Sequence, residues 1–396
     1  MKLNNRSLSL FFIAVYLFIC TAESLPESRY YFALAFLAAA VIFNGKVTLR
    51  KKTVTTFLYF FLFIVTITII GAMDILTYKS NINYPANIAI VNLTSKLILC
   101  FAIFIVINNE NELYHVLGIL IIIHSFIFAV QFFSIYTTKH YIDIVYFFSD
   151  ETSRYGGGFS IPWIGNIYRV TGIYVEPSTY SGFVFTYITI RYFLSNTLEK
   201  KDQFALSTCI LSLSIASIIY CSLLLLVLFL KKKEITPNRI LMTTITFTLL
   251  PIAAYFIIDI ITSRISYTDG SAIYLRENLF DIVFIKQTLS EILIGNGLLG
   301  YPTIIANFLN QGGLWQAQLA ALNDNGIWLF IIMKFGLIGL LAITFVLFRN
   351  TNNISSFLVL SLVLFTKISI MNYTFILFST IILMFPQFNK NIKVKV

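Results

Sequence analysis

Two long polar segments each contain a pair of arginines, in a chain that is otherwise mostly apolar. The segments are 137–178, which holds Arg154 and Arg169, and 260–325, which holds Arg264 and Arg276. An arginine side chain is a planar fork that can donate two parallel, charge-assisted hydrogen bonds to a phosphate. If Arg264 and Arg276 shared one helix they would stand about 18 Å apart, so they need not bind the same phosphate. The four arginines predict an anionic substrate such as a diphosphate.

Two carboxylates beside these segments are candidates for acid–base chemistry. Glu176 precedes Pro177 at the expected start of an apolar helix, and Asp324 lies between two asparagines before another. A carboxylate near an arginine-bound phosphate can act as a general base. The alternative is structural, because such residues commonly cap a helix or interact with its dipole. Arg169 likewise has the alternative of binding lipid headgroups, and the spacing leaves these alternatives open.

Lys334 is a further candidate, since it lies about eight residues, or roughly 12 Å, into an expected apolar helix. A cation at the centre of a bilayer costs roughly 2.5–3.5 kcal/mol, so such residues usually face a cavity or extend to the surface. Lys334 is therefore a candidate for lining an aqueous cavity that holds a diphosphate. Arg191 and Lys367 are nearer to expected helix ends and are predicted to reach the membrane surface. The segment Gly295–Gly300 has no preceding strand, so it is predicted to be a backbone turn and not a nucleotide site.

The composition determines the class of fold that must position these residues. Hydrophobic residues make up 58% of the chain and charged residues only 12%, whereas a soluble domain carries about 25% charged residues. Several apolar runs approach the roughly 20 residues that a helix needs to cross a bilayer. Backbone groups in lipid must pair within their own segment, which favours helices. We expect an all-α polytopic membrane protein with a single membrane domain over 1–396. The cysteines lie in apolar runs without CxxC spacing and are expected to be inert core residues: Cys20, Cys100, Cys209 and Cys221.

About twelve spans are expected, and the first, which resembles a signal peptide, is expected to be retained. They are 7–22, 30–45, 53–73, 86–107, 115–136, 179–195, 203–216, 217–230, 238–259, 326–348, 354–369 and 372–387. Lysines flank 203–230 on both sides, and lysines favour the cytoplasm, so this stretch is predicted to be a hairpin broken near 212–217. The same rule splits the last apolar stretch near Lys367–Asn372. The formal charge of +10 is thus interpreted as an orientation signal and not as affinity for nucleic acid. Both termini are expected in the cytoplasm, and both long segments outside.

The order of these motifs resembles the O-antigen polymerase and O-antigen ligase superfamily. The resemblance rests on R-x-T-G-x-x-x-E-P from Arg169 to Pro177, then S-R at Arg264 and R-E-N at Arg276. A G-x-G segment follows at Gly295, and then D-N at Asp324, leading into K-F-G-L-I-G from Lys334. It covers roughly residues 169–339 and the expected number of spans.

The resemblance implies a metal-independent glycosyltransferase, with no cofactor, at the outer leaflet of the bacterial cytoplasmic (inner) membrane. Its substrate would be an undecaprenyl-diphosphate-linked oligosaccharide. A polymerase transfers the growing glycan to an incoming lipid-linked repeat unit, with a separate chain-length regulator as a possible partner. A ligase transfers the glycan to lipid A core, and ligases carry a histidine where the second external loop meets the next span. Here that junction reads Asn323-Asp324-Asn325, and the histidines are His115, His124 and His140, which favours polymerase. The resemblance assigns diphosphate binding to Arg169 with Arg264 or Arg276.

A transporter of lipid-linked oligosaccharides is the alternative from another functional class. It would share the many spans and the basic, anion-binding character. Transporters tend to show related halves and charges inside the membrane. This chain shows no evident half-repeat and concentrates its polar residues in two unequal segments, which favours the enzyme.

Overall fold

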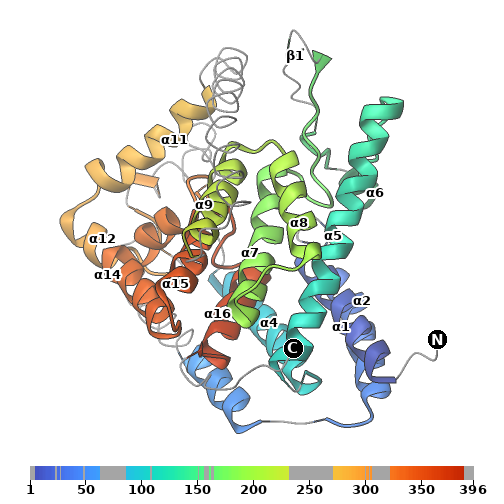
Figure 1. The fold of residues 1–396 in the computed structure, drawn as a ribbon. Coiled ribbons are helices and arrows are strands. Elements are labelled where there is room, and N and C mark those ends of the chain that lie inside the picture. Colours follow the sequence, from blue (N-terminus) through green and yellow to red (C-terminus); the bar gives the residue numbers. More distant parts are fainter. Residues whose placement is uncertain are drawn as a thin grey trace.

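The structure is a computed structural model that describes residues 5–22, 25–26, 28–47, 50–62, 86–107, 109–149, 151–155, 160–161, 165–231, 271–298, 300–302, 304–305 and 322–387. These residues are mostly helical, as expected for the all-α class (Figure 1). The sheet found among them is a two-stranded antiparallel pairing of β1 (Ser160–Ile161) with β2 (Gly165–Asn166). The predicted span 238–259 lies outside the described residues.

The first half of the chain forms helices close to the predicted spans, and one short helix inside the first polar segment. Those close to predicted spans are α1 (Asn5–Thr21), α2 (Arg29–Asn44), a helix over 51–62, α4 (Ala86–Ala102) with the 3₁₀ turn η1 (Ile103–Ile105), and α5 (Glu110–Thr138). The short helix in the polar segment is α6 (Ile144–Ser149). α1 and α2 are antiparallel, since Ser9 Oγ near the start of α1 donates to the Ala40 carbonyl near the end of α2 at 2.8 Å. α5 begins where the Asn109 side chain accepts from the Glu112 N–H, the N-cap interaction that satisfies a free helix donor.

The second half contains the remaining elements, among them the kinked helix α14. They are α7 (Pro177–Ser195), α8 (Lys200–Leu211), α9 (Ile215–Lys231), α11 (Ser271–Asp281), the π-helical turn η2 (Ile282–Lys286), α12 (Leu289–Ile294), α14 (Ile327–Arg349), α15 (Ile354–Ser361), the 3₁₀ turn η3 (Leu362–Phe365) and α16 (Tyr373–Met384). The described part of the second polar segment is therefore largely helical. Within the described residues, α5 and α14 are long and apolar enough to cross a membrane.

α7 is the central helix, and α5, α8, α9, α15 and α16 all pack against it (Figure 1). Nearly all of its side chains are buried, although it carries several hydroxyl groups. Those groups are paired between helices: Tyr180 with Thr208 at 2.7 Å, and Tyr187 with Thr374 at 2.6 Å. Because a buried hydroxyl without a partner is costly, these pairs fix how α8 and α16 lie against α7.

The predicted hairpin in 203–230 is confirmed. The helix breaks between α8 and α9, where Leu213 has a left-handed φ of 53°. The end of α8 lies near the start of α7, because Thr208 bonds to Tyr180. α9 then returns toward the end of α7, since Lys231 Nζ donates to the Tyr192 hydroxyl at 2.8 Å. The expected split near Lys367 is also confirmed, because η3 ends at Phe365 and α16 begins at Tyr373.

A buried ion pair lies at the end of α7 near Ser195. Arg191 is fully buried, and its Nε and Nη2 donate to the two carboxylate oxygens of Asp202 at 2.6 and 3.2 Å. Its guanidinium also stacks on the Tyr114 ring, 3.7 Å from the centroid. The prediction that Arg191 extends to the surface was wrong, because Asp202 at the start of α8 neutralises it inside the bundle.

The bundle thus has two ends, which we name by the α7 residues found there. At the Arg191 end lie the starts of α1 and α5, where Arg6 pairs with Glu112, and the start of α8. At the Glu176 end lie the starts of α7 and α14 and the 366–367 segment that precedes α16. The two ends are about 22 Å apart along α7. Polar groups from distant parts of the chain therefore meet at each end.

Candidate active site

Four charged side chains meet at the Glu176 end, and we call them the carboxylate cluster: Arg154, Glu176, Asp324 and Lys367. Lys367 Nζ lies 2.8 Å from Asp324 Oδ1 and 3.6 Å from Glu176 Oε2. Arg154 pairs with the other carboxylate oxygen of Glu176. The structure therefore joins the two carboxylates that the sequence singled out, through a lysine that the sequence analysis had assigned to the membrane surface.

Glu176 is positioned by the folded end of the first polar segment. It occupies the N-cap position of α7 with an extended backbone, and Pro177 opens the helix. Its carboxylate does not cap the helix but accepts a hydrogen bond from Ser178 Oγ at 3.1 Å. The preceding Gly172 has a left-handed φ of 63°, and a Cβ there would lie 2.7 Å from the Tyr180 ring. Glycine is required at this turn, which brings the chain back to the start of α7.

A second set of hydrogen bonds holds Arg154 beside Glu176. The Arg154 N–H donates to the Val175 carbonyl at 2.7 Å, and the Arg169 N–H donates to the Tyr155 carbonyl at 3.0 Å. The Tyr155 ring stacks on Tyr141, with 3.9 Å between centroids. Residues 154–155 are therefore anchored by backbone hydrogen bonds to Arg169 and Val175, and by ring stacking to Tyr141.

Asp324 and Lys367 are positioned by a turn before α14. Asn323 Nδ2 donates to the Lys367 carbonyl at 2.6 Å, and the Ile327 N–H donates to the Thr366 carbonyl at 3.0 Å. The N-cap of α14 is Gly326, with a φ of 99° and no side-chain cap. Asp324 is therefore not a helix cap in this structure, and its carboxylate is directed to Lys367.

The cluster is partly shielded from water and electrically balanced. Lys367 exposes 10% of its side chain, Asp324 22% and Glu176 27%, whereas Arg154 exposes 69%. Burial by itself raises the pKa of the Glu176 carboxyl, but Lys367 and Arg154 outweigh burial and hold that pKa below its ordinary value. Glu176 is therefore a firmly ionised partner of two cations. Among the described residues, Lys367 is the one cation within ion-pair distance of Asp324.

The other predicted arginines occupy different places. Arg169 is half-buried beside the cluster-bearing segment. Arg276 lies in α11, half-buried, and its carbonyl accepts from Asn325 Nδ2 at 3.0 Å, next to Asp324 in sequence. α11 is thereby tied to the turn that carries Asp324. Arg264 lies outside the described residues.

Lys334 is buried against the glycine-rich segment. Its Nζ donates to the Gly300 carbonyl at 2.5 Å and lies 3.6 Å from the centroid of the Tyr301 ring. None of these contacts is with the carboxylate cluster. The predicted backbone turn is present, since Gly295 and Gly297 both have left-handed φ values. The Lys334 ammonium thus lies against the Gly300 carbonyl and the Tyr301 ring in the structure.

The turn also packs against a kink in α14. Gly336 has a non-helical φ of 65° inside that helix, and a Cβ on it would lie 2.1 Å from the Leu293 carbonyl oxygen. Asn296 Nδ2 donates to the Met333 carbonyl at 2.9 Å, and that carbonyl is in the turn preceding the kink. The glycines of both segments thus allow two backbones to approach closely.

Lys367 is the functional candidate that the sequence analysis missed. It was expected to extend to the membrane surface, whereas it is mostly buried and paired with Asp324. A signal was present, because Lys367 interrupts an apolar stretch at the same predicted side of the membrane as Glu176 and Asp324. A cation on that side, close to a helix end, could have been considered together with the carboxylates.

Comparison of the chain with family models, with curated proteins and with solved structures gives no match. Within the described ranges, no group of three His, Cys, Asp or Glu residues is arranged to hold a metal ion. The fold and site therefore define a helical bundle with an ion-paired carboxylate–lysine cluster at one end.

Proposed function

We propose that this chain is a polysaccharide repeat-unit polymerase of the cytoplasmic membrane. It would transfer a growing glycan from undecaprenyl diphosphate to an incoming lipid-linked repeat unit. The observation that carries the proposal is the position of Lys367 between Asp324 and Glu176, with Arg154 on the far side of Glu176. Such a site offers both a base for a sugar hydroxyl and cations for a departing diphosphate.

The proposal includes a polytopic topology with about twelve spans, and the charges at the helix ends support its orientation. Lys201 and Lys231, which flank 203–230, gather with Arg6 and Arg191 at one end of the bundle, and the carboxylate cluster lies at the other. Cytoplasmic segments carry an excess of Lys and Arg. The Arg191 end is then cytoplasmic, together with both termini, and the cluster faces the outer leaflet, where lipid-linked sugars would reach it.

In the proposed reaction, Asp324 is the general base. The acceptor hydroxyl gives its proton to the Asp324 carboxylate, and its oxygen forms a bond to the anomeric carbon of the donor glycan. The bond from that carbon to the diphosphate oxygen breaks, and undecaprenyl diphosphate leaves with the electron pair. We assign the base to Asp324 because Lys367 and Arg154 lower the pKa of Glu176 and so weaken the Glu176 carboxylate as a base. General bases typically contribute 10²–10⁴-fold to such reactions.

Cations at the site would stabilise the charge that develops on the departing diphosphate. Arg154 is the most exposed member of the cluster, so its guanidinium can turn from Glu176 toward a phosphate without unpacking the bundle. Arg169, Arg276 and Arg264 are the further arginines that the proposal assigns to diphosphate binding. Lys367 would keep Asp324 and Glu176 together until the anionic substrate binds.

Deletion of the gene in its host, with and without plasmid rescue, tests this function. Electrophoresis of the surface polysaccharide should show single repeat units on an otherwise normal anchor, and rescue should restore long chains. Long chains that accumulate on the lipid carrier while their acceptor stays bare would identify a ligase instead. An unchanged ladder would contradict both glycosyltransferase functions and direct attention to transport.

A further inference from the structure

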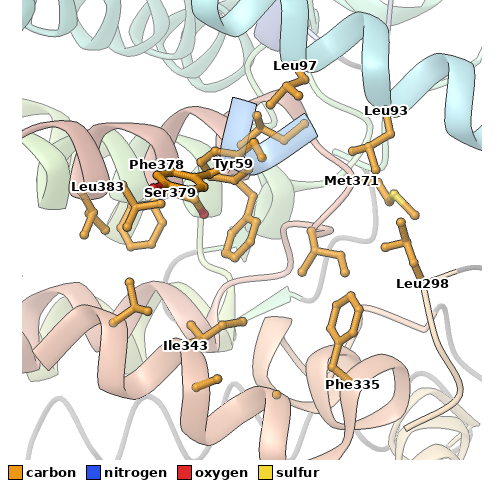
Figure 2. Close-up of a pocket in the computed structure, with 18 of the residues that line it drawn as sticks. Tyr59, Leu93, Leu97, Leu298, Phe335, Ile343, Met371, Phe378, Ser379 and Leu383 are labelled. Carbon is orange, nitrogen blue, oxygen red and sulfur yellow. The ribbon is translucent and has the colours of Figure 1, made fainter. Parts of the chain in front are cut away.

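An apolar cavity of about 530 Å³ runs between the helix over 51–62, α4, α14 and α16. Its walls are almost entirely aliphatic and aromatic, and Tyr59 and Ser379 are the lining side chains that carry a hydroxyl group (Figure 2). Figure 2 shows Leu298, Met371 and Phe335 grouped at one end of the cavity and Leu383 at the other. The cavity is therefore elongated, and it follows the length of α16.

One end of this cavity lies close to the carboxylate cluster along the chain. Ile370 and Met371 line the cavity, and they follow Lys367, which pairs with Asp324, by three and four residues. The other end, at Leu383 and Leu347, lies toward the Arg191 end of the bundle, where α14 and α16 finish. A molecule with a long apolar part and a polar head would thus have its head at the cluster.

A second lysine stands at the same end. Lys96 on α4 lies between Leu93 and Leu97, which both line the cavity, and its Nζ donates to the Met371 carbonyl at 3.2 Å. Among the described residues, no carboxylate lies within ion-pair distance of Lys96. A cation placed in a membrane-spanning helix without a carboxylate is costly, and an anionic head group at the mouth of the cavity would offset that cost.

We propose that this cavity holds the hydrocarbon chain of the lipid-linked substrate, with the diphosphate between Lys96 and Lys367. This assignment rests on the proposed function, because the closeness of Ile370 and Met371 to Lys367 along the chain is what favours the substrate lipid over a bulk phospholipid. Lipid tails are as apolar as the cavity wall, so burial of the chain adds little affinity by itself. The cavity positions the hydrocarbon chain of the lipid, and the cations at the mouth of the cavity select its diphosphate head group.

The chain offers a matched pair of variants on α14. Ala342 lines the cavity, so Ala342→Trp places a large ring inside it. Leu341, one residue earlier, is 68% exposed on the outside of the helix and is not among the lining residues, so Leu341→Trp adds the same ring outside. Lys96→Met is a second, charge-removing variant that preserves the length of the side chain.

The test is photo-crosslinking of the full-length protein in liposomes with a polyprenyl diphosphate that carries a diazirine in its chain and no sugar. The label should map to 335–347 and 370–383, and unlabelled polyprenyl diphosphate should compete for it while excess phosphatidylglycerol does not. Ala342→Trp should abolish the label and Leu341→Trp should keep it. Lys96→Met should weaken competition by the diphosphate about tenfold, as loss of one charge-assisted hydrogen bond predicts.

Labelling elsewhere, equal competition by phosphatidylglycerol, or equal loss of label in Leu341→Trp would overturn the assignment. Because the probe carries no sugar, its binding does not depend on catalysis. A labelled cavity in a protein whose deletion leaves the polysaccharide unchanged would contradict the polymerase function while supporting the lipid site. Polymerase activity without label in the cavity would support the polymerase function while contradicting the lipid site.

Discussion

Lys367 Nζ and Asp324 Oδ1 lie 2.8 Å apart, although 43 positions separate the two residues in the chain. The contact joins the turn before α14 to the segment before α16, and Glu176 at the start of α7 completes the group. Three helix starts therefore share one lysine. Lys367 therefore links carboxylates from distant parts of the chain into one ion-paired cluster.

Replacement of Lys367 should reduce polymerisation even where the protein still accumulates to its normal level. Lys367→Met should reduce polymerisation by about 10²-fold, the typical cost of losing one preorganised charge donor at a reacting centre. Lys367→Arg should retain part of the activity, because it keeps the charge. The measurement is the polysaccharide ladder in the deletion strain at matched protein levels. Lys201→Met, at the opposite end of the bundle where Lys201 pairs with Glu199, serves as control and should give a normal ladder.

The ion pairs of Glu176 should stabilise the protein in a pH-dependent way. Because Lys367 and Arg154 outweigh burial and lower the pKa of Glu176, their stabilisation is fully present above the ordinary Glu value of about 4.3 and is lost as pH falls through the lower folded pKa. The unfolding midpoint of the wild type in detergent should exceed that of Glu176→Gln near neutral pH. The gap should shrink only below about pH 4. A gap that widens on acidification would contradict the sign of the shift.

Asp202→Asn should destabilise the bundle by about 3 kcal/mol, since the buried Arg191 guanidinium loses its buried carboxylate partner and keeps only the exposed Glu199, 3.2 Å away. The double variant Arg191→Met, Asp202→Leu should recover most of that loss, because an apolar pair of similar volume leaves no buried charge. Unfolding in detergent, followed by circular dichroism, measures both. If the double variant were as unstable as Asp202→Asn, the buried charge would not be the cause.

Gly336→Ala should destabilise the protein more than Gly45→Ala. Both glycines have left-handed φ values, but a Cβ on Gly336 meets the Leu293 carbonyl at 2.1 Å, whereas a Cβ on Gly45 meets nothing within 4 Å. Gly45→Ala, the control, should therefore lower the free energy of unfolding only by the backbone strain of roughly 1–2 kcal/mol. The difference between the two unfolding midpoints then measures the contact between α12 and α14. Equal midpoints would show that this close approach contributes nothing.

Much of the helical pattern could be predicted from the sequence, because apolar runs and lysine positions are local properties. The break at Ser212–Ser217 shows this well: lysines at both ends of 203–230 require a hairpin, and the helix does break at Leu213. The helices of the second polar segment were not predicted, since α11 and α12 are short and carry no apolar stripe long enough to distinguish them from a loop.

The site was predictable in its residue types but not in its pairing. Glu176 and Asp324 stood out because each precedes a helix after a polar segment. Lys367 did not, because its role depends on two residues far away in the chain, and an isolated lysine near a helix end most often reaches the membrane surface. The prediction for Arg191 was wrong for the same reason: its partner Asp202 belongs to the next helix, and the pairing depends on how the two helices pack.

The most direct test of the central claim is the activity of Asp324→Asn. The substitution keeps the size of the side chain and removes its basic carboxylate, so the protein should fold and bind the lipid-linked units without joining them. In the deletion strain, at wild-type protein level in the membrane, Asp324→Asn should leave single repeat units on the anchor. A full-length ladder from the same strain would contradict the assignment of the carboxylate cluster as the active site.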